Sequence, residues 1–523
     1  QSLSEGNLMP RWAGNLNWGY GHPILMFLYP LPSYAASLFH FLGFSLVDSV
    51  KLVFALAFIA SGVAMYLWLR EFLGEHSAIA GSILYNFAPY RFVDLYVRGA
   101  IGEHVAFIFP PLICYFLLKL STVGPPRGSP YEHPRGVFIN RFYFAGACLS
   151  IAGLILSHNA LTLMFLPFII FYALYLVWVN KKTRVSLMYQ YIGSFFLGIG
   201  LSSFFLLPAF EEGKYTLRDI VTRGVALGRF VDFKNLVSSP WNFGQTGQFS
   251  VEVGFIFWAA FLSSPFVLYK LWKNNKHGFA FYAFLLFYFV TSIFIMLPES
   301  KFVWQNITTL QKFQFPWRFL SVSVFAGAIL TAYSISLITN KNVRIIVAIV
   351  MIAFALISTR NFWQPKDYLM KSESFYSGVY DGTTDTGESS PIWSVRFMER
   401  RPKAHVEVIK GKASIQETLR NSTHHVYEIN ASSKVRIREN TLYFPGWRVY
   451  IDGKRYQDIQ FQDPMNRGLM TFYVPLGQHT VDVKFAENRL RTISNYFSIA
   501  SLALVFGILF KTYKHLRSKF LIN

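Results

Sequence analysis

The chain has 523 residues, of which 53% are hydrophobic and 15% are charged. This composition excludes an ordinary soluble protein, because the apolar residues also come in long blocks. The formal net charge of +21 does not indicate a nucleic-acid partner, since the basic residues gather in short segments between those blocks. We therefore expect a membrane protein whose first partner is the lipid bilayer.

The first segment, 1–45, is predicted to be an external loop. Its part 22–42 is apolar but contains Pro23, Pro30 and Pro32 near the start. Proline disrupts a helix interior. The pattern therefore indicates an interfacial helix rather than a full span.

Eleven apolar stretches follow, each long enough, or nearly so, for the roughly 20 residues that cross a bilayer. They lie at about 46–70, 77–96, 103–120, 141–158, 159–179, 187–209, 253–272, 279–297, 316–338, 343–359 and 495–512. The sequence thus predicts a mostly helical polytopic protein with a transmembrane domain at 46–359, and a last span and basic tail at 493–523.

The basic loops determine the predicted orientation. If the spans alternate, the basic segments near 119–141, 181–184, 270–276, 341–344 and 511–519 all lie on one side. By the positive-inside rule this side is cytoplasmic. We expect a multi-pass protein of the cytoplasmic (inner) membrane, with 1–45 and 360–492 external and a cytoplasmic C-terminus. An external start without a signal peptide also predicts a further membrane helix upstream of Gln1.

Two external regions interrupt the apolar pattern. The loop 210–252 is acidic at its start and rich in glycine near its end, and loops of this length commonly carry a function. Region 360–492 alternates apolar and polar residues between turn signals. Seven short strands are predicted there, which indicates a small β-sandwich inserted before the last span. They lie at 405–409, 425–429, 433–438, 441–444, 448–452, 470–474 and 480–485.

Charged side chains gather where the second predicted span ends and the third begins. Asp94, Arg98, Glu103 and His104 stand there. Charges at this depth are costly and commonly face a cavity or a partner. Asp94 and Arg98 are also spaced i,i+4, so a structural ion pair is the alternative interpretation.

Three further polar groups lie at external ends of spans. His158 occupies a tight turn, where a satisfied turn residue is the simpler interpretation. Glu211 and Glu212 follow a span, either as solvated helix-end charges or as a carboxylate pair that holds a cation or an acceptor. Gln314 and Arg318 flank the start of another span, where a guanidinium matches a phosphate through two hydrogen bonds.

Several motifs give the chain a family resemblance. They are 6–12 (GNLMPRW), 17–23 (NWGYGHP), 28–32 (LYPLP), 94–103 (DLYVRGAIGE), 157–159 (SHN), 314–318 (QFPWR), 381–384 (DGTT) with Glu388 and Trp393, 444–447 (FPGW) and 452–454 (DGK). Their order and spacing over nearly the whole chain resemble the bacterial polytopic membrane proteins labelled "6-pyruvoyl-tetrahydropterin synthase-related". Those proteins are relatives of the GT-C glycosyltransferases.

The resemblance implies a polyprenyl-phosphate-sugar-dependent glycosyltransferase. Such an enzyme transfers a sugar from a polyprenyl-phosphate carrier to a glycan, lipid or protein acceptor of the cell envelope on the external face. It often uses a divalent metal, Mg²⁺ or Mn²⁺, whose ligands the resemblance does not identify. The catalytic candidates are Asp94, Glu103 and His158. The substrate-binding candidates are Arg98, Arg318, Gln314, Glu211 and Glu212.

The resemblance also places the family's catalytic acid in the first external loop, after the first span. No aspartate precedes Asp48, and Glu5 is the only earlier carboxylate. That acid is therefore expected upstream of Gln1.

Two alternatives remain open at this level. One is a non-catalytic scaffold whose external domain binds envelope partners. The other is a component of a polysaccharide or lipid transporter, for which inverted repeats and charges deep inside spans are expected. The glycosyltransferase hypothesis instead requires Asp94, Glu103, His158 and Arg318 to lie together.

Overall fold

The computed structural model describes residues 1–122, 134–244 and 249–520, with side chains for all of these but 134–139 and 511–520. Residues 123–133 of the predicted basic segment 119–141, residues 245–248 of the loop 210–252 and the last three residues of the predicted basic tail therefore lie outside the described residues. The chain divides into two compact units. Unit 1 comprises Gln1–Pro30, Ser203–Arg223 and Ser372–Ser498, and unit 2 comprises Leu31–Ser202, Gly224–Lys371 and Ile499–Asn523.

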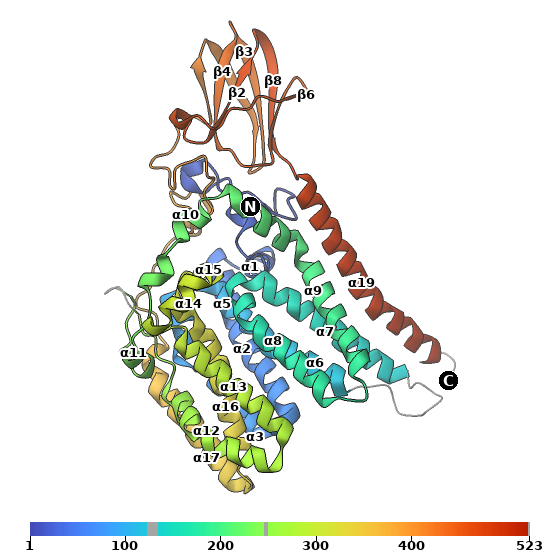
Figure 1. Cartoon of the computed structure of the whole chain (residues 1–523). Helices are drawn as coiled ribbons and strands as arrows, with labels where there is room; N and C mark the ends of the chain where they lie inside the picture. The colour runs from blue at the N-terminus through green and yellow to red at the C-terminus, as the bar shows by residue number, and fades with distance from the viewer. Residues whose placement is uncertain (123–133, 245–248, 521–523) are drawn as a thin grey trace. The chain divides into compact units, whose positions relative to one another are not determined.

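Unit 2 is built from helices. The longer ones are α1 (Leu31–Phe41), α2 (Leu46–Leu73), α3 (Glu75–Asn86), α6 (Phe109–Thr122), α7 (Pro134–Ser157), α8 (Asn159–Val179), α12 (Phe255–Asn274), α13 (Lys276–Phe294), α16 (Leu320–Ser336) and α17 (Lys341–Thr359). Two others, α9 (Arg184–Glu211) and α19 (Arg489–Phe520), continue into unit 1. Short helices connect them: α4 (Pro89–Phe92), η3 (Val93–Val97), α5 (Ile101–Ala106), η5 (Val225–Gly228), α11 (Phe233–Val237), η6 (Pro298–Ser300), α14 (Lys301–Asn306), α15 (Thr308–Gln311), η7 (Pro316–Phe319) and η8 (Arg360–Phe362). Helices α6, α7 and α8 lie side by side (Figure 1).

Among the described residues, ten helical segments are long and apolar enough to cross a membrane. They are Leu46–Leu73, Ile101–Thr122, Asn140–Ser157, Asn159–Val179, Arg184–Tyr215, Phe255–Asn274, Lys276–Phe294, Pro316–Ser336, Lys341–Phe362 and Arg489–Phe510. Large apolar side chains such as Leu262, Phe266 and Ile349 are exposed on them. Such exposure is unfavourable in water and favourable against lipid. The chain is a multi-pass, membrane-type helical protein.

The predicted span 77–96 is not one continuous helix. Helix α3 ends at Asn86, after 12 residues, and α4 and the π-helix η3 follow. Pro89 causes the break, because proline has no N–H to donate and disfavours helical geometry in the residue before it. Ala88 is accordingly extended, with ψ of 143°.

Aromatic packing forms the core of unit 2. Trp68 of α2 is fully buried, and its indole N–H donates to the hydroxyl of Tyr172 at 2.8 Å. Its ring stacks on Phe325 of α16 and meets Phe168 and Phe281 edge to face. One side chain thus joins four helices, and aromatic pairs of this kind add to the stability that burial gives.

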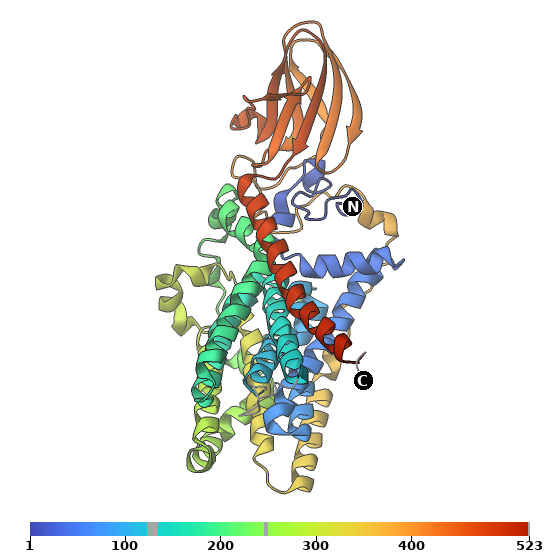
Figure 2. The same cartoon turned by 90° about the vertical axis from the view of Figure 1, so that its right-hand side faces the viewer.

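Unit 1 carries two antiparallel sheets. Strands β1 (Val406–Lys410), β4 (Val435–Leu442) and β7 (Leu469–Val474) form one sheet in the order β1-β4-β7. Strands β2 (Ala413–Arg420), β3 (His424–Ala431), β5 (Trp447–Ile451), β6 (Lys454–Tyr456) and β8 (Gly477–Phe485) form the other, in the order β2-β3-β8-β5-β6. Figure 2 shows the strands of this unit running alongside one another. Its short helices are η1 (Asn17–Gly19), η2 (Pro23–Met26), η4 (Glu212–Tyr215), α10 (Arg218–Thr222), α18 (Glu373–Ser377) and η9 (Pro464–Asn466).

Both sheets contribute to one cluster of buried apolar side chains. Ile437 and Phe472 come from the three-stranded sheet, and Tyr427 and Val483 from the five-stranded one. The N-terminal segment adds Trp12, which meets Trp447 edge to face at 5.4 Å. Unit 1 is therefore one folded domain assembled from three separate stretches of chain.

The strand predictions differ from the structure at three places. Only the first two residues of the predicted strand 441–444 are in a strand: they are the end of β4, and no separate strand forms there. Strands β2 and β6 were not predicted: β2 carries mostly polar and exposed residues, and β6 has only three residues. Both stand at edges of the five-stranded sheet, where one-sided burial leaves little apolar alternation to detect.

Candidate functional site

The interruption of the second predicted span places three charged residues in a small volume of unit 2. Asp94 lies in the π-helix η3, and Arg98 follows it. Gly99 has φ of +58°, and the N–H of Ala100 turns back to the carbonyl of Asp94 at 2.8 Å. Helix α5 then begins at Ile101 and carries Glu103. Single-turn π-helices are frequent at functional sites, which makes this stretch a candidate.

Arg98 connects the two carboxylates. Its Nη1 donates to Asp94 Oδ1 at 2.5 Å and to Glu103 Oε2 at 2.8 Å, and its Nη2 donates to Glu103 Oε1 at 2.6 Å. The pair with Glu103 is thus a two-pronged, charge-assisted contact, the strongest kind between such groups. Both carboxylates are buried, whereas 14% of the Arg98 side chain is exposed.

Glu103 is the centre of this cluster. Besides Arg98, its Oε2 accepts a hydrogen bond from the Tyr90 hydroxyl at 2.9 Å. Its Oε1 lies 3.2 Å from Arg318 Nε and 3.7 Å from His158 Nε2. Both oxygens of Glu103 are therefore engaged, and the carboxylate holds cationic and polar groups from three separate segments of the chain in place.

Asp94 has a different environment. Its Oδ1 accepts from Arg98, whereas its Oδ2 is buried and has no hydrogen-bond partner among the described residues. Buried carboxylate oxygens are normally hydrogen-bonded, so an unengaged one indicates a function or a partner that arrives from elsewhere. The i,i+4 ion pair with Arg98 is present, and it leaves half of the Asp94 carboxylate available.

His158 has both a structural and a site-facing role. It is the N-cap of α8, and its Nδ1 accepts the backbone N–H of Leu161 at 3.2 Å. The neutral ring then carries its proton on Nε2, the atom that faces Glu103. The turn interpretation and the cluster interpretation of His158 are therefore both consistent with its position.

Two cluster residues were absent from the predicted site. Tyr90 donates to Glu103 and accepts from Arg98 Nη1 at 3.0 Å. The ring of Trp317, the residue before Arg318, lies under the Arg98 guanidinium at 4.5 Å. Trp317 belongs to the 314–318 motif of the resemblance, whereas Tyr90 lies just before the 94–103 motif. The available signal was the residue type, a phenol and an indole close in sequence to an arginine.

Gln314 lies on the same segment as Arg318 and has φ of +65°. A positive φ is uncommon for residues other than glycine, and it marks the turn that leads into Pro316 and η7. Arg318 donates through Nη1 to the carbonyl of Phe313 at 2.8 Å, across this turn. The backbone of the turn thus helps to fix Arg318 beside Glu103.

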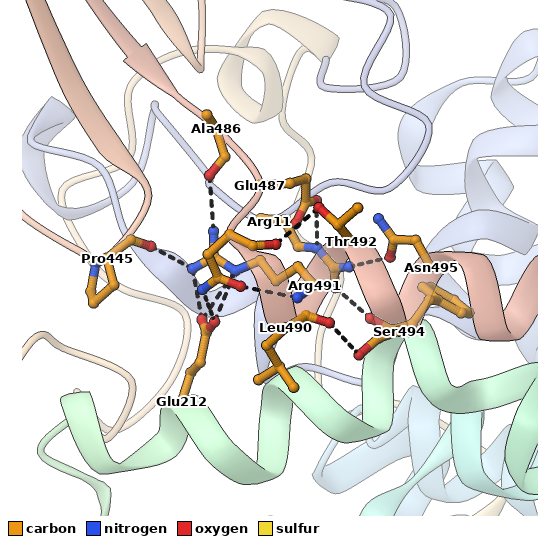
Figure 3. Close-up of polar contacts among 12 residues, drawn as sticks. Arg11, Glu212, Pro445, Ala486, Glu487, Leu490, Arg491, Thr492, Ser494 and Asn495 are labelled. Carbon is orange, nitrogen blue, oxygen red and sulfur yellow. Dashed lines mark hydrogen bonds and ion pairs between the residues drawn. The ribbon is translucent and has the colours of Figure 1, made fainter. Parts of the chain in front are cut away.

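The other two predicted substrate-binding residues belong to unit 1 and have contrasting surroundings. Glu211 is half exposed and pairs with Lys214. Glu212 is buried, and Figure 3 shows its carboxylate facing the guanidinium of Arg491. Arg491 Nη2 donates to Glu212 Oε2 at 2.6 Å, and Asn488 donates to Oε1 at 2.5 Å. This arrangement favours a structural role for Glu212.

A second buried arginine lies in the same view (Figure 3). Arg11 Nε donates to Glu487 at 3.2 Å, and its Nη2 donates to Asn495 at 2.9 Å. Burial lowers the pKa of the Arg11 guanidinium, and the neighbouring Glu487 opposes that effect. Arg11 thus anchors the N-terminal segment to the start of α19.

The Asp94–Glu103 cluster does not fit a divalent-cation site. Mg²⁺ and related ions take several oxygen ligands. Both oxygens of Glu103 and one of Asp94 are engaged by cationic or hydroxyl groups. Within the described residues, no group of three or more His, Cys, Asp or Glu side chains stands close enough together to hold a metal ion.

Comparison with known proteins gives one distant relative. No family model and no solved structure matches the chain. A protein of Lactococcus lactis subsp. cremoris, described only as an uncharacterized protein, is 27% identical over 225 residues. The match covers 41% of this chain and 33% of the relative, so the chain spans about a third of the relative's length. The relative's description carries no activity to transfer.

Proposed function

We propose that the protein is an integral membrane glycosyltransferase of the GT-C type. It transfers a sugar from a polyprenyl-phosphate carrier to an acceptor of the cell envelope, on the external face of the cytoplasmic membrane. The observation that carries this proposal is the cluster in unit 2. There, two guanidinium groups meet two buried carboxylates, and one carboxylate oxygen, Asp94 Oδ2, is unengaged.

The two carboxylates have different roles in this mechanism. Asp94 Oδ2 is the general base, because it alone among the four carboxylate oxygens lacks a partner in the described residues. Glu103 is a positioning residue that fixes Arg98, Arg318 and His158. This division follows from hydrogen bonding: a carboxylate saturated by cations is a weak base.

The reaction is an inverting displacement. Asp94 accepts the proton of the acceptor hydroxyl while that oxygen attacks the anomeric carbon. The bond from the anomeric carbon to the phosphate oxygen breaks, and its electron pair stays on the lipid phosphate. Arg98 and Arg318 stabilise the charge that grows on that phosphate, which is where fixed cations contribute most. No step is assigned to a metal ion.

The external β domain, which we interpret as a small sandwich, belongs to the same proposal as an acceptor-binding part. This assignment is an analogy at the level of fold.

A non-catalytic scaffold is the second candidate. The observation in its favour is the charge balance of the cluster, since structural ion-pair networks also bury paired charges. In that case Asp94 and Arg98 stabilise the interrupted span and do no chemistry.

The experiment is sugar transfer by the full-length protein in proteoliposomes, with radiolabelled polyprenyl-phosphate glucose, galactose and N-acetylglucosamine as donors and envelope membranes as acceptor. Asp94→Asn should lower transfer by about 100-fold or more, the usual contribution of a general base. The matched control is Glu71→Gln, because Glu71 is an ion-paired carboxylate of α2 that contacts Lys119 outside the cluster. Absence of transfer by the folded wild-type protein would favour the scaffold, and wild-type transfer by a folded Asp94→Asn protein would refute Asp94 as the general base.

A further inference from the structure

A cavity of about 480 Å³ lies within unit 1, outside the site described above. Its lining combines the N-terminal segment, the chain before β1 and the edge strand β2. The lining residues that the argument uses are Trp18, Arg401, Lys403, His405, Glu417 and Arg420. The volume falls within the roughly 300–1,000 Å³ typical of small-molecule sites.

Trp18 is held in the cavity wall by an unusual backbone. Asn17 and Trp18 both have positive φ, 54° and 62°. Such a backbone conformation is unfavourable for residues other than glycine and persists only where the surroundings impose it. Here the backbone N–H groups donate to the carbonyls of Gly382 (2.7 Å, from Asn17) and Tyr380 (3.1 Å, from Trp18). The strain therefore presents a large, half-buried aromatic ring at a fixed place.

Charged side chains line the same cavity as Trp18, and the positive ones predominate among the lining residues. Three cationic side chains, Arg401, Lys403 and Arg420, line the cavity together with one carboxylate, Glu417. Arg401 is 58% exposed and pairs with Asp381 at 3.0 Å, so its guanidinium still faces solvent. Arg420 donates to Glu439 at 3.3 Å, and His405 lies 2.9 Å from Glu417. The formal charges of Arg401, Lys403, Arg420 and Glu417 sum to +2.

We propose that this cavity binds an acidic saccharide, a sugar unit that carries a carboxylate or a phosphate. The Trp18 ring supplies the flat apolar surface on which the C–H face of a sugar packs, and indole combines that surface with a polar edge. Arg401 and Lys403 supply the anion contacts, and a guanidinium matches carboxylate and phosphate through two parallel hydrogen bonds. This inference rests on the proposed function, in which such a saccharide is part of the acceptor.

The test is calorimetric titration of the full-length protein in lipid nanodiscs with three probes. Tetragalacturonate carries carboxylates, mannopentaose 6-phosphate carries a phosphate, and maltotetraose is neutral. At least one acidic probe should bind about tenfold or more tightly than maltotetraose, and raising the salt from about 0.1 M to about 1 M should weaken that binding. Equal binding of all three probes, or binding of none, overturns the proposal.

Variants connect the binding to the cavity. The double variant Arg401→Gln with Lys403→Gln should bind the acidic probe with about tenfold lower affinity, as expected for the loss of two exposed charge contacts. Lys454→Gln is the matched control, because Lys454 is an exposed lysine of β6 that does not line the cavity. If the control variant lost as much affinity for the acidic probe as the double variant, the assignment of the binding site to this cavity would be refuted. Trp18→Ala, checked for an unchanged melting temperature, should lower the affinity for every sugar probe that binds.

Asp94→Asn separates this inference from the proposed function. It should lower transfer by about 100-fold or more and leave the affinity for the acidic probe unchanged. If the wild-type protein transfers no sugar, the proposed function fails, and if Asp94→Asn transfers sugar at the wild-type rate, the assignment of Asp94 as the general base fails. If Arg401→Gln with Lys403→Gln leaves the affinity unchanged, the cavity assignment fails whatever the result for transfer.

Discussion

Adjacent glutamates at the end of α9 offer a sharp test of what burial does to a charge. Glu212 and Arg491 are 2% and 0% exposed, and the guanidinium contacts the carboxylate at 2.6 and 3.1 Å. Arg491 also donates to the carbonyl of Pro445 at 2.5 Å. Glu211, one residue earlier, is 52% exposed and pairs with Lys214.

Glu212→Gln removes the negative charge and leaves the buried guanidinium without an ion-pair partner. Removing one partner of a buried ion pair costs about 3–5 kcal/mol, because the remaining charge stays out of water. For a domain of the size of unit 1, each kcal/mol corresponds to about 2–4 °C in melting temperature. The melting transition of unit 1 should therefore fall by about 6–20 °C.

The assay is thermal unfolding followed by tryptophan fluorescence, with Glu211→Gln as the control. The exposed ion pair of Glu211 should contribute about 1 kcal/mol or less to the free energy of unfolding, so Glu211→Gln should change the melting temperature little. The double variant Glu212→Leu with Arg491→Met should recover most of the loss, since apolar residues of similar volume commonly replace a buried pair without cost. Equal shifts for Glu211→Gln and Glu212→Gln, or no recovery in the double variant, would refute the reasoning.

Two further predictions concern the β domain and the candidate site. Burial works to raise the pKa of Glu439, but His425 and Arg420 hold it at about 2, below the ordinary 4.5. The resulting stabilisation is complete above pH 4.5 and is lost as the pH falls from 4.5 towards 2. It amounts to about 3 kcal/mol, so acid unfolding followed by circular dichroism should be shallower in Glu439→Gln. Trp317→Leu removes the ring under Arg98 and should lower sugar transfer by about 2- to 30-fold at unchanged melting temperature, the range of a cation–π contact.

Hydropathy was sufficient to predict most of the helical architecture. A stretch of about 20 apolar residues has few alternatives to a membrane helix. The ten membrane-type helices overlap predicted spans for that reason. Strand prediction in the β domain was less complete. The burial pattern of β3 alternates along the strand, whereas β2 is exposed at most positions and carries little periodic signal.

The sequence was sufficient to select most residues of the candidate site, but not to predict which of them contact one another. Asp94, Arg98, Glu103, His158 and Arg318 were all selected because each is ionisable and lies near an end of a span. Sequence spacing gave one contact, the i,i+4 pair of Asp94 and Arg98. The contacts of Glu103 with Arg318 and His158 join distant segments, and no local pattern encodes them.

The interruption of the second span explains why Arg98 can serve both carboxylates. On a continuous helix, Arg98 and Glu103 would be spaced i,i+5, about 140° apart around the axis, and their side chains would diverge. Gly99, with φ of +58°, turns the chain between them, so that Glu103 starts a new helix and faces back to Arg98. The same turn leaves Asp94 with a single arginine contact and one unengaged oxygen. The break that removes a regular span therefore makes the two carboxylates unequal, and the proposed division into a general base, Asp94, and a positioning residue, Glu103, depends on this inequality.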